Sequence, residues 1–324
     1  MNSRHWAIVL AGGQGSRLRS LTADERGIPI PKQFCSLRGG CSLLREALRR
    51  AQAAAPRAQI CTVVAAQHDH WWSRDLCDLP DANVIVQPAN RGTANGILLP
   101  LLHIGARDAG ALLAVLPSDH HVQDEAALAL ALRAAMQQIE LERGHVLLLG
   151  ISPDEADPEL GYIVPGADTG RRLHAVESFV EKPAAPIARQ LVRDGALWNS
   201  FVLVAHAGTL LQFIERKIPA IVAGMRACLR QDGYQPNGGA ALRAFYADLP
   251  SIDFSRQILH GSEPLLRVVR VPACGWSDLG TPRRLAATLR RLPADRDPQA
   301  AHSQPLPGLL SLAVQQARLG AAAP

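Results

Sequence analysis

A glycine-rich loop followed by a lysine is the first feature of this chain that could do chemistry. Residues 10–18 read Leu-Ala-Gly-Gly-Gln-Gly-Ser-Arg-Leu and follow an apolar run. Glycines let the backbone turn tightly and point N–H groups at an anion, and Arg17 adds a fork of donors. Lys32 follows within the sequence Pro-Lys-Gln-Phe. The pattern indicates a phosphate-binding loop, with a tight turn that binds nothing as the alternative.

Two familiar phosphate-binding loops do not match this segment. The dinucleotide fingerprint G-x-G-x-x-G needs a third glycine where the chain has Leu18, and no acidic residue ends the second expected strand. The Walker loop needs Gly-Lys followed by Ser or Thr, and the chain contains no Gly-Lys pair. These mismatches argue against a nicotinamide oxidoreductase and against a Walker-type phosphate site.

The glycine-rich loop and the Pro-Lys-Gln-Phe sequence together resemble the signature of the sugar-1-phosphate nucleotidyltransferases. Gln33 in the second motif favours the mannose-1-phosphate guanylyltransferase branch of that family. Further motifs follow in family order, so the resemblance covers about residues 5–285. They are Pro-Ala-Asn-Arg-Gly-Thr-Ala at 88–94, Pro-Ser-Asp-His at 117–120, Gly-Tyr-Ile at 161–163, Val-Glu-Lys-Pro at 180–183, Trp-Asn-Ser at 198–200, Ser-Ile-Asp at 251–253 and Trp-Ser-Asp-Leu-Gly-Thr at 276–281.

The resemblance implies attack by a sugar 1-phosphate on the α-phosphorus of a nucleoside triphosphate, with release of pyrophosphate. Such a displacement needs alignment and charge neutralisation more than covalent chemistry. Arg17 and Lys32 would be the catalytic cations. Arg17 would help to hold the triphosphate, and Lys32 would lie over the α-phosphate, where a compact ammonium serves better than a planar guanidinium does. A surface lysine in a loop is the alternative for Lys32. The nucleotide would be bound by Leu10, Gly12, Gly13, Gly15, Ser16, Arg17, Gln87, Arg91 and Thr93.

Two aspartates are the candidate ligands of a Mg²⁺ cofactor. Asp119 follows the strand expected at 111–116, where a doubly wound sheet places ligand groups. A hard carboxylate there suits Mg²⁺, which binds one or two carboxylates together with substrate phosphate and water. The resemblance supplies Asp278 as the second carboxylate. Either aspartate could instead be a turn or helix-capping residue.

The resemblance also implies a sugar-phosphate site in the second half of the chain. Lys182 would bind the phosphate of the sugar, while Glu181 and Asn199 would bind sugar hydroxyls beside the backbone of Gly161. A solvated ion pair at the end of a strand is the alternative for the adjacent Glu181 and Lys182.

Two departures from the family pattern concern specificity. Residues 91–96 read Arg-Gly-Thr-Ala-Asn-Gly, whereas the guanylyltransferase segment resembles Arg-Asn-Thr-Ala-Pro-Ala, which leaves the base open. Gln87, Arg91 and Thr93 are the candidates for binding base and ribose, and Thr93 could instead cap a helix. Phe201 stands where many relatives have glycine, which leaves the shape of the sugar pocket open.

The leading hypothesis is therefore a Mg²⁺-dependent mannose-1-phosphate guanylyltransferase that uses GTP and makes GDP-mannose. One alternative is a thymidylyl- or uridylyltransferase that acts on glucose 1-phosphate. The other is a non-catalytic sugar-nucleotide-binding regulator with the same fold, although a regulator has no need of the groups that face the reacting phosphates.

The elements that must position these residues alternate through the first 150 residues. Short β-rich runs predict strands at 6–10, 60–65, 83–87, 111–116 and 145–151. Helical patterns separate them at 42–55, 67–77, 93–109 and 125–142. This alternation predicts an α/β fold with a doubly wound, mostly parallel sheet, which the resemblance identifies as the Rossmann-like nucleotidyltransferase fold. Ligands should then bind at the carboxyl ends of the strands.

The second half of the chain has a mixed pattern. Strands are expected at 162–164, 172–180, 197–205 and 265–271, and helices near 186–193, 207–217, 220–231 and 240–247. We expect one catalytic domain over residues 1–292, with a nucleotide-binding half up to about 150 and a sugar-phosphate-binding half over 151–292. Residues 293–324 read as a Pro-rich linker and a short apolar C-terminal segment that could dock as a helix.

The composition of the chain indicates its cellular compartment and excludes some classes of binding partner. Of 324 residues, 48% are apolar and 19% charged, which suits a large core and excludes a disordered chain. Only three of the 34 basic residues are lysines, and no basic run or aromatic-interleaved basic patch indicates a nucleic acid partner. No apolar run predicts a membrane span or a signal peptide, so we expect a cytoplasmic protein with small-molecule substrates and no membrane partner. We also allow for a homodimer.

Overall fold

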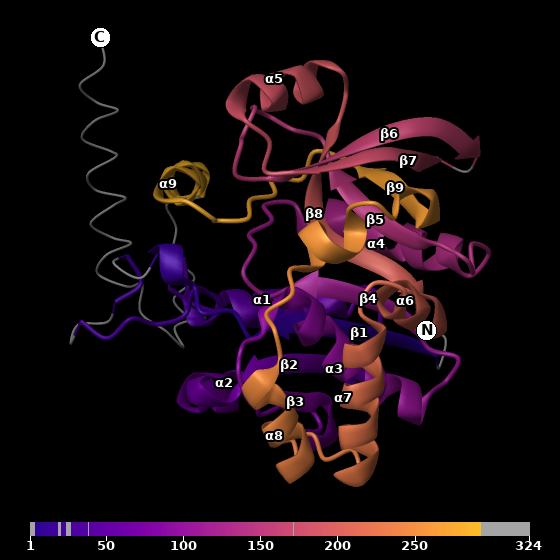
Figure 1. The fold of residues 1–324 in the computed structure, drawn as a ribbon. Helices are drawn as coiled ribbons and strands as arrows, with labels where there is room; N and C mark the ends of the chain where they lie inside the picture. Colours follow the sequence, from indigo (N-terminus) through magenta and orange to yellow (C-terminus); the bar gives the residue numbers. More distant parts are fainter. Residues whose placement is uncertain (1–3, 19–20, 24–26, 38, 171, 293–324) are drawn as a thin grey trace.

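A single mixed sheet forms the centre of the molecule (Figure 1). The computed structural model describes residues 4–18, 21–23, 27–37, 39–170 and 172–292. Within these residues nine strands pair in the order β3-β2-β1-β4-β8-β5-β9-β7-β6. The linker and C-terminal segment expected at 293–324 lie outside the described residues.

The four strands at one end of the sheet are parallel. They are β1 (His5–Ala11), β2 (Ile60–Ala65), β3 (Val84–Gln87) and β4 (Leu112–Pro117). Each was predicted to within about one residue at either end, because a short apolar run bounded by polar or turn residues is typical of a strand buried on both faces. Since the strands are parallel, their carboxyl ends lie along the same edge of the sheet.

The second half of the chain completes the same sheet with mostly antiparallel pairings. Strand β8 (Leu197–His206) lies between β4 and β5 (Val146–Ile151) and is antiparallel to both. Strand β9 (Leu266–Val271) is parallel to β5, and β6 (Gly161–Gly170) forms a hairpin with β7 (Leu173–Glu181). The predicted α/β class, with a parallel first part and a mixed second half, is confirmed. The sheet as a whole is less parallel than predicted, because β8 and the β6–β7 hairpin add antiparallel pairings. Strand β6 exceeds the expected 162–164 because register shifts accommodate Pro165.

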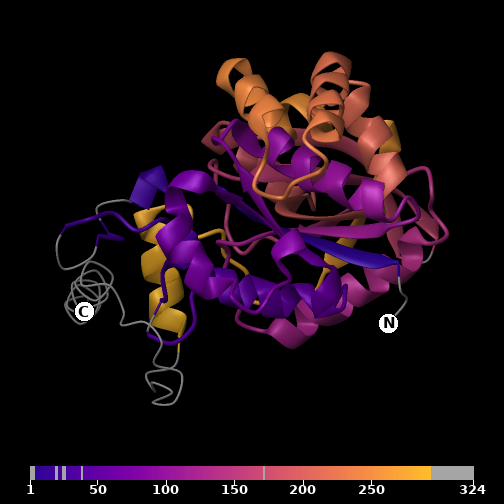
Figure 2. The same ribbon diagram turned by 90° about the horizontal axis from the view of Figure 1, so that it is seen from below.

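Helices cover both faces of this sheet (Figure 2). Alternation along β1 sets the two layers, since Ala7 and Val9 pack into one cluster of apolar side chains and Trp6 and Ile8 into the other. The first layer contains α1 (Leu43–Ala51), α2 (Asp69–Asp75), α4 (Glu125–Ile139) and α5 (Ala185–Arg193), and the second contains α3 (Gly92–Arg107), α6 (Ala207–Glu215), α7 (Pro219–Gln231) and α8 (Ala240–Asp248).

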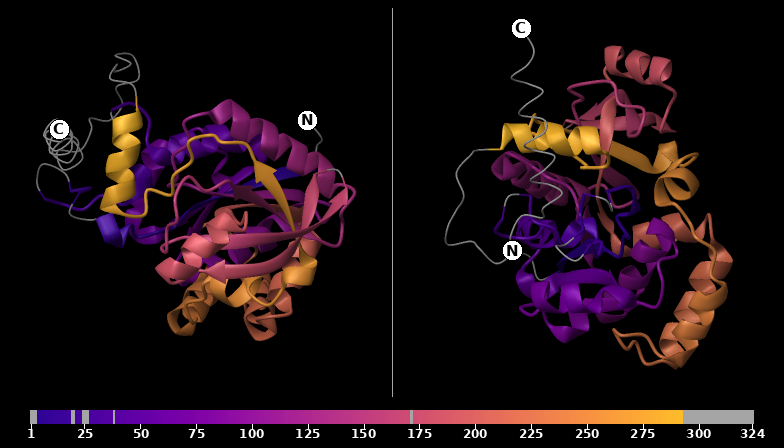
Figure 3. Two further views of the ribbon diagram at one scale, coloured as in Figure 1. Left: turned by 90° about the horizontal axis from the view of Figure 1, so that it is seen from above. Right: turned by 90° about the vertical axis from the view of Figure 1, so that its left-hand side faces the viewer.

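Several helices are shorter than their sequence pattern, and one helix was not predicted. The pattern at 42–55 gives α1 only to Ala51, after which the chain forms tighter turns before Pro56. The additional helix is α9 (Pro282–Arg291), which begins at Thr281, whose side chain accepts a hydrogen bond from the N–H of Arg284. In Figure 3 it stands beside the N-terminal segment that follows β1, where its leucines complete a small third cluster with Leu18.

Candidate active site

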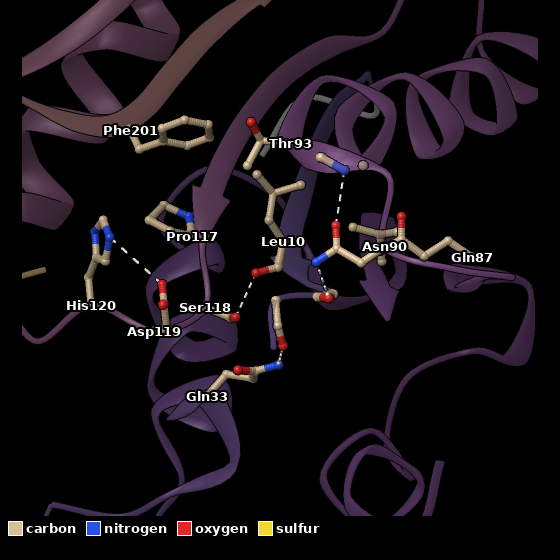
Figure 4. Close-up of a pocket in the computed structure, with 15 residues that line it drawn as sticks. Leu10, Gln33, Gln87, Asn90, Thr93, Pro117, Ser118, Asp119, His120 and Phe201 are labelled. Carbon is tan, nitrogen blue, oxygen red and sulfur yellow. Dashed lines mark hydrogen bonds and ion pairs between the residues drawn. The ribbon is translucent and has the colours of Figure 1, made fainter. Parts of the chain in front are cut away.

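A cavity of about 240 Å³ lies at the carboxyl ends of the parallel strands (Figure 4). Strands β1 to β4 and the loops that follow them supply most of its wall, and α3 and β8 supply the rest. This is the edge at which the predicted topology places a ligand. The lining residues are Leu10, Gly12, Gly13, Gln33, Val63, Gln87, Asn90, Gly92, Thr93, Gly96, Pro117, Ser118, Asp119, His120 and Phe201.

Three side chains hold the carbonyl oxygens of the glycine-rich loop (Figure 4). The Nε2 of Gln33 donates to Ala11 O at 2.9 Å and to Gly13 O at 2.8 Å. The Nδ2 of Asn90 donates to Gly12 O at 3.1 Å, and the Oγ of Ser118 donates to Leu10 O at 2.6 Å. In a trans peptide the N–H points away from the C=O, so fixing the carbonyls also fixes where the loop N–H groups point. The loop is thus preorganised to receive an anion.

Sequence reasoning did not name Gln33, Asn90 or Ser118 as site residues. All three lie inside motifs that carried the resemblance, at 31–34, 88–94 and 117–120. Their position in those motifs was an available signal, but their role as anchors of another loop depends on contacts between distant segments.

Gln87 and Gly12 are in close contact. A Cβ added at position 12 would lie 2.1 Å from the Nε2 of Gln87, so any larger residue there would displace the Gln87 amide. Gln87 is buried, and its Oε1 has no hydrogen-bond partner among the described residues. A buried amide oxygen without a partner at a cavity wall is suited to accept a hydrogen bond from a ligand.

Thr93 and Arg91, both expected to contact base or ribose, have different surroundings in the structure. Thr93 lines the cavity, and its Oγ1 accepts a hydrogen bond from the N–H of Phe254 at 2.8 Å instead of capping α3. The guanidinium of Arg91 donates to the carbonyl oxygens of Tyr246 at 3.0 Å and Ala247 at 2.7 Å, at the end of α8. Arg91 therefore ties α3 to α8 and does not line the cavity, contrary to its expected contact with base or ribose.

A second cavity, of about 190 Å³, adjoins the first. Asp119 lines both, and the second is also lined by Gly15, Arg17, Leu18, Lys32, Leu279 and Gly280. The expected catalytic cations Arg17 and Lys32 are thereby brought together at one end of the site. Ser16 begins the 3₁₀ turn that carries Arg17. Arg17 itself is exposed, 3.6 Å from Glu159, so its guanidinium can turn toward a ligand at little cost.

Lys32 is the most constrained charge of the site. It is only 8% exposed, so it is not a surface lysine. Its Nζ lies 2.9 Å from the Oδ2 of Asp119 and donates to the carbonyl oxygens of Asp278 at 2.6 Å and Leu279 at 3.4 Å. Burial acts to raise the pKa of Asp119, but the Lys32 ammonium and His120 outweigh it and hold that pKa below its ordinary value. The Asp119 carboxylate is therefore charged at neutral pH.

The segments that carry Asp119 and Asp278 lie side by side although they are far apart in the sequence, because His121 pairs with Ser277 as in a strand. Asp119 lines both cavities, whereas Asp278 lines neither, and its carboxylate faces Arg284 next to Leu279 and Gly280 of the second cavity. Within the described chain no three His, Cys, Asp or Glu side chains surround a common point. One or two carboxylates at this end of the site would suit Mg²⁺, which takes its remaining ligands from phosphate and water.

The expected sugar-phosphate residues form a separate group. Gly161 on β6 pairs with Glu181 on β7, and the next residue along β6 pairs with Trp198, which precedes Asn199. Burial, reinforced by Asp253, raises the pKa of Glu181. Lys182 is exposed and has a left-handed φ of 48°. The geometry thus gathers Gly161, Glu181 and Asn199 at the end of the hairpin, outside the lining of the two cavities.

Phe201 occupies a backbone conformation that normally favours glycine. Its φ is 58°, and its ring contacts Phe254 edge to face with the centroids 6.0 Å apart. It closes the side of the first cavity near Pro117 and Thr93 (Figure 4). Glycine, which the family resemblance leads us to expect here, adopts this φ without strain, and the Phe201 ring occupies space at the cavity wall that glycine would leave open.

Comparison with known proteins agrees with the motifs. A family model described as "Nucleotidyl transferase" matches residues 6–293. The chain is 31% identical over 281 residues to the xanthan biosynthesis protein XanB of Xanthomonas campestris pv. campestris, covering 85% of this chain and 57% of the relative. It is also 31% identical over 291 residues to the mannose-1-phosphate guanylyltransferase ManC of Salmonella typhimurium, covering 85% of this chain and 58% of the relative.

The fold is also similar to solved structures. One is described as a mannose-1-phosphate geranyltransferase from Thermus thermophilus, with a TM-score of 0.72 and 28% identity over 90% of this chain and 81% of that chain. The resemblance drawn from the motifs is confirmed, although the chain spans little more than half the length of the curated relatives it matches. No helix among the described residues is both long enough and apolar enough to cross a membrane.

Proposed function

The chain belongs to the nucleotidyl transferase family, and from this premise we propose that it makes a nucleotide sugar from a nucleoside triphosphate and a sugar 1-phosphate. The substrates proposed are GTP and mannose 1-phosphate, and the products GDP-mannose and pyrophosphate. One observation carries the proposal. The buried ammonium of Lys32 lies against Asp119 at the junction of a cavity that ends at Gln87 and a cavity that contains Arg17.

This arrangement suits a nucleotide that extends through both cavities. The nucleoside would lie against Gln87 and Thr93, and the triphosphate would follow the glycine-rich loop past Asp119 toward Arg17. Lys32 would then face the α-phosphate at the junction. Its positive charge would offset the negative charge that increases on the phosphoryl oxygens as the bond to pyrophosphate breaks.

The sugar 1-phosphate would approach from the hairpin of β6 and β7. Glu181 and Asn199 would bind sugar hydroxyls, and Lys182 would bind the phosphate whose oxygen attacks the α-phosphorus. Asp119 and Asp278 would hold Mg²⁺, which when bound neutralises charge on the triphosphate. The role of the protein is to align the two phosphates, because positioning accounts for much of the acceleration in such a displacement.

GTP and mannose 1-phosphate are favoured by the names of the relatives reported above. The departures at 91–96 are compatible with that choice. Asn95 does not line the cavity, and its Nδ2 donates to Arg91 O at 2.6 Å and Pro250 O at 3.0 Å. Gly96 lines the cavity and adds no side chain there, which leaves room for a purine.

A pyrophosphate-release screen tests this proposal. Purified protein is assayed with four nucleoside triphosphates against mannose 1-phosphate and glucose 1-phosphate, with and without Mg²⁺. We expect GTP with mannose 1-phosphate to give the highest kcat/KM, and only with Mg²⁺ present. Preference for dTTP or UTP with glucose 1-phosphate would instead establish a thymidylyl- or uridylyltransferase.

Two lysine variants provide the matched controls. Lys32→Met should abolish turnover with every substrate pair. Lys217→Met should retain it, because the Nζ of Lys217 donates to the carbonyl oxygens of His260 and Gly261, outside the lining of both cavities. Binding of GDP-mannose without any turnover by the wild-type protein would indicate a sugar-nucleotide-binding regulator.

A further inference from the structure

Arg284, in the first turn of α9, is a buried arginine that contacts three separate segments. Its Nε donates to the Oδ2 of Asp157 at 2.6 Å, and its Nη1 lies 3.4 Å from the Oδ1 of Asp278. Its guanidinium also lies 4.6 Å from the centroid of the Trp198 ring. Asp157 precedes β6, and Trp198 precedes Asn199 on β8. One side chain thus joins α9 to elements that carry the expected sugar and metal residues.

The two oxygens of the Asp278 carboxylate have different surroundings. Oδ1 faces Arg284, and Oδ2 lies beside Gly280, which lines the second cavity, so close that a Cβ added at Gly280 would be 2.1 Å away. The main-chain oxygen of Asp278 accepts a hydrogen bond from Lys32. Arg284 thus holds one carboxylate oxygen and leaves the other at the edge of the cavity that contains Lys32 and Arg17.

We propose that Arg284 is a positioning residue that orients the Asp278 carboxylate toward the metal-bound triphosphate. The inference rests on the proposed function, because it assigns Asp278 to Mg²⁺. Arg284 acts through Asp278 and does not touch substrate. A planar guanidinium can hold two carboxylates in fixed directions at once, which a lysine ammonium cannot do with the same geometry.

Two other arginines of α9 form ion pairs on the surface and serve as a comparison for Arg284. Arg283 pairs with Glu155 and Arg291 with Asp154, and all four of these side chains are largely exposed. Arg284 and Asp157 are both buried, and the fork of Arg284 continues to Asp278. Groups that orient a metal ligand from behind typically change metal affinity about 10- to 100-fold when they are removed. Loss of a surface ion pair has little effect by comparison.

The experiment compares Arg284→Lys with Asp157→Asn and Arg283→Lys. Binding of Mn²⁺ is measured by electron paramagnetic resonance on protein saturated with GDP-mannose, alongside thermal unfolding of each variant. We expect Arg284→Lys to raise the Kd for Mn²⁺ about 10-fold. Asp157→Asn should lower stability while leaving that Kd within about threefold, since Arg284 keeps its contact with Asp278. Arg283→Lys should change neither quantity.

The measured Kd for Mn²⁺ decides whether Arg284 positions Asp278. If wild-type protein binds Mn²⁺ and Arg284→Lys binds it equally well, the inference is overturned while the proposed function stands. If the wild type binds no Mn²⁺ in a manner sensitive to Asp119→Asn, both fail. Should Arg284→Lys not fold, the double variant Asp157→Asn/Arg284→Gln removes two buried charges together, and an unchanged Kd there overturns the inference as well.

Discussion

At the scale of single residues, the site depends on where a few charges are placed. Only three of the 34 basic residues are lysines, and one of them is buried between the two candidate metal ligands. Arginine would supply the same positive charge as Lys32, and it is the basic residue at almost all other positions of the chain. The ammonium of Lys32 lies 2.9 Å from the Asp119 carboxylate and 2.6 Å from the Asp278 carbonyl oxygen, and a longer, planar guanidinium cannot place its charge at the same point.

We therefore expect Lys32→Arg to lower kcat by about 100-fold or more while leaving the KM for the nucleoside triphosphate within about threefold. The positive charge is kept, but it no longer lies at the junction of the two cavities. Steady-state kinetics of the forward reaction check this, with Lys217→Arg as the control. Unchanged turnover in Lys32→Arg would remove Lys32 from the mechanism.

Phe201 provides a second prediction at this scale. Truncation to alanine loses the ring contact with Phe254 and keeps a Cβ at a φ of 58°, whereas glycine loses the ring and relieves the strain. Phe201→Gly should therefore be more stable than Phe201→Ala by about 1 kcal/mol. Urea unfolding of the two variants measures the difference, and equal or reversed stabilities would contradict strain at this position.

At the scale of elements, the glycine-rich loop is shaped by its neighbours more than by its own glycines. Gln33, from the next turn of the chain, holds two of its carbonyl oxygens, and residues at the ends of β3 and β4 hold two more. Asn90 and Ser118 follow different strands, so the loop keeps these two contacts only while β3 and β4 stay in register with β1. If the loop binds phosphate as proposed, that binding depends on the integrity of the parallel sheet.

The variant Gln33→Leu tests this coupling. It should lower the free energy of unfolding by about 1–3 kcal/mol, because the carbonyl oxygens of Ala11 and Gly13 lose their donor. It should also raise the KM for the nucleoside triphosphate, since the loop N–H groups are no longer held in place. Gln14→Leu is the matched control, because Gln14 lies in the same loop but is exposed. Equal effects of the two changes would refute the anchoring role of Gln33.

At the scale of the whole molecule, two buried histidines make stability depend on pH. Burial, reinforced by Arg107, lowers the pKa of His103 on α3 to about 4, and burial lowers the pKa of His120 to about 4 despite the neighbouring Asp119. Both rings are neutral in the folded protein at pH 7. The ordinary value of 6.5 applies once the chain unfolds. Between these values the unfolded chain binds more protons, so stability falls as the pH decreases from 6.5 toward 4.

We accordingly expect each of the two histidines to contribute a loss of about 2 kcal/mol to the free energy of unfolding between pH 7 and pH 5. The raised pKa of Glu46, about 7, contributes with the opposite sign over the same range, so the test is the difference between variant and wild type. His103→Gln removes one titrating group away from the site and should reduce that fall by about the same amount. Urea titrations of both proteins at pH 7 and pH 5 measure the difference. An identical fall in wild type and variant would show that His103 does not contribute.

The fold and much of the site could be predicted from local pattern. Alternation of apolar runs with helical periodicity located the strands, and short motifs located Lys32, Asp119 and the glycine-rich loop. Helix α9 was missed because its ten residues are mostly arginine and small apolar residues, and its leucines find partners only on a distant segment. Arg91 was assigned to the nucleotide because its motif lies at the site, yet its side chain turns to α8.

The sequence alone therefore determined which elements form and which residue types stand at their ends, because periodicity and motif spacing are local properties of the chain. Only the tertiary structure decided which of those residues meet. The insertion of β8 between β4 and β5, the approach of Asp278 to Lys32 and the contact of Arg284 with Asp157 all join segments that are far apart in the chain. Such contacts depend on how the sheet and helices pack, and local patterns carry no information about it.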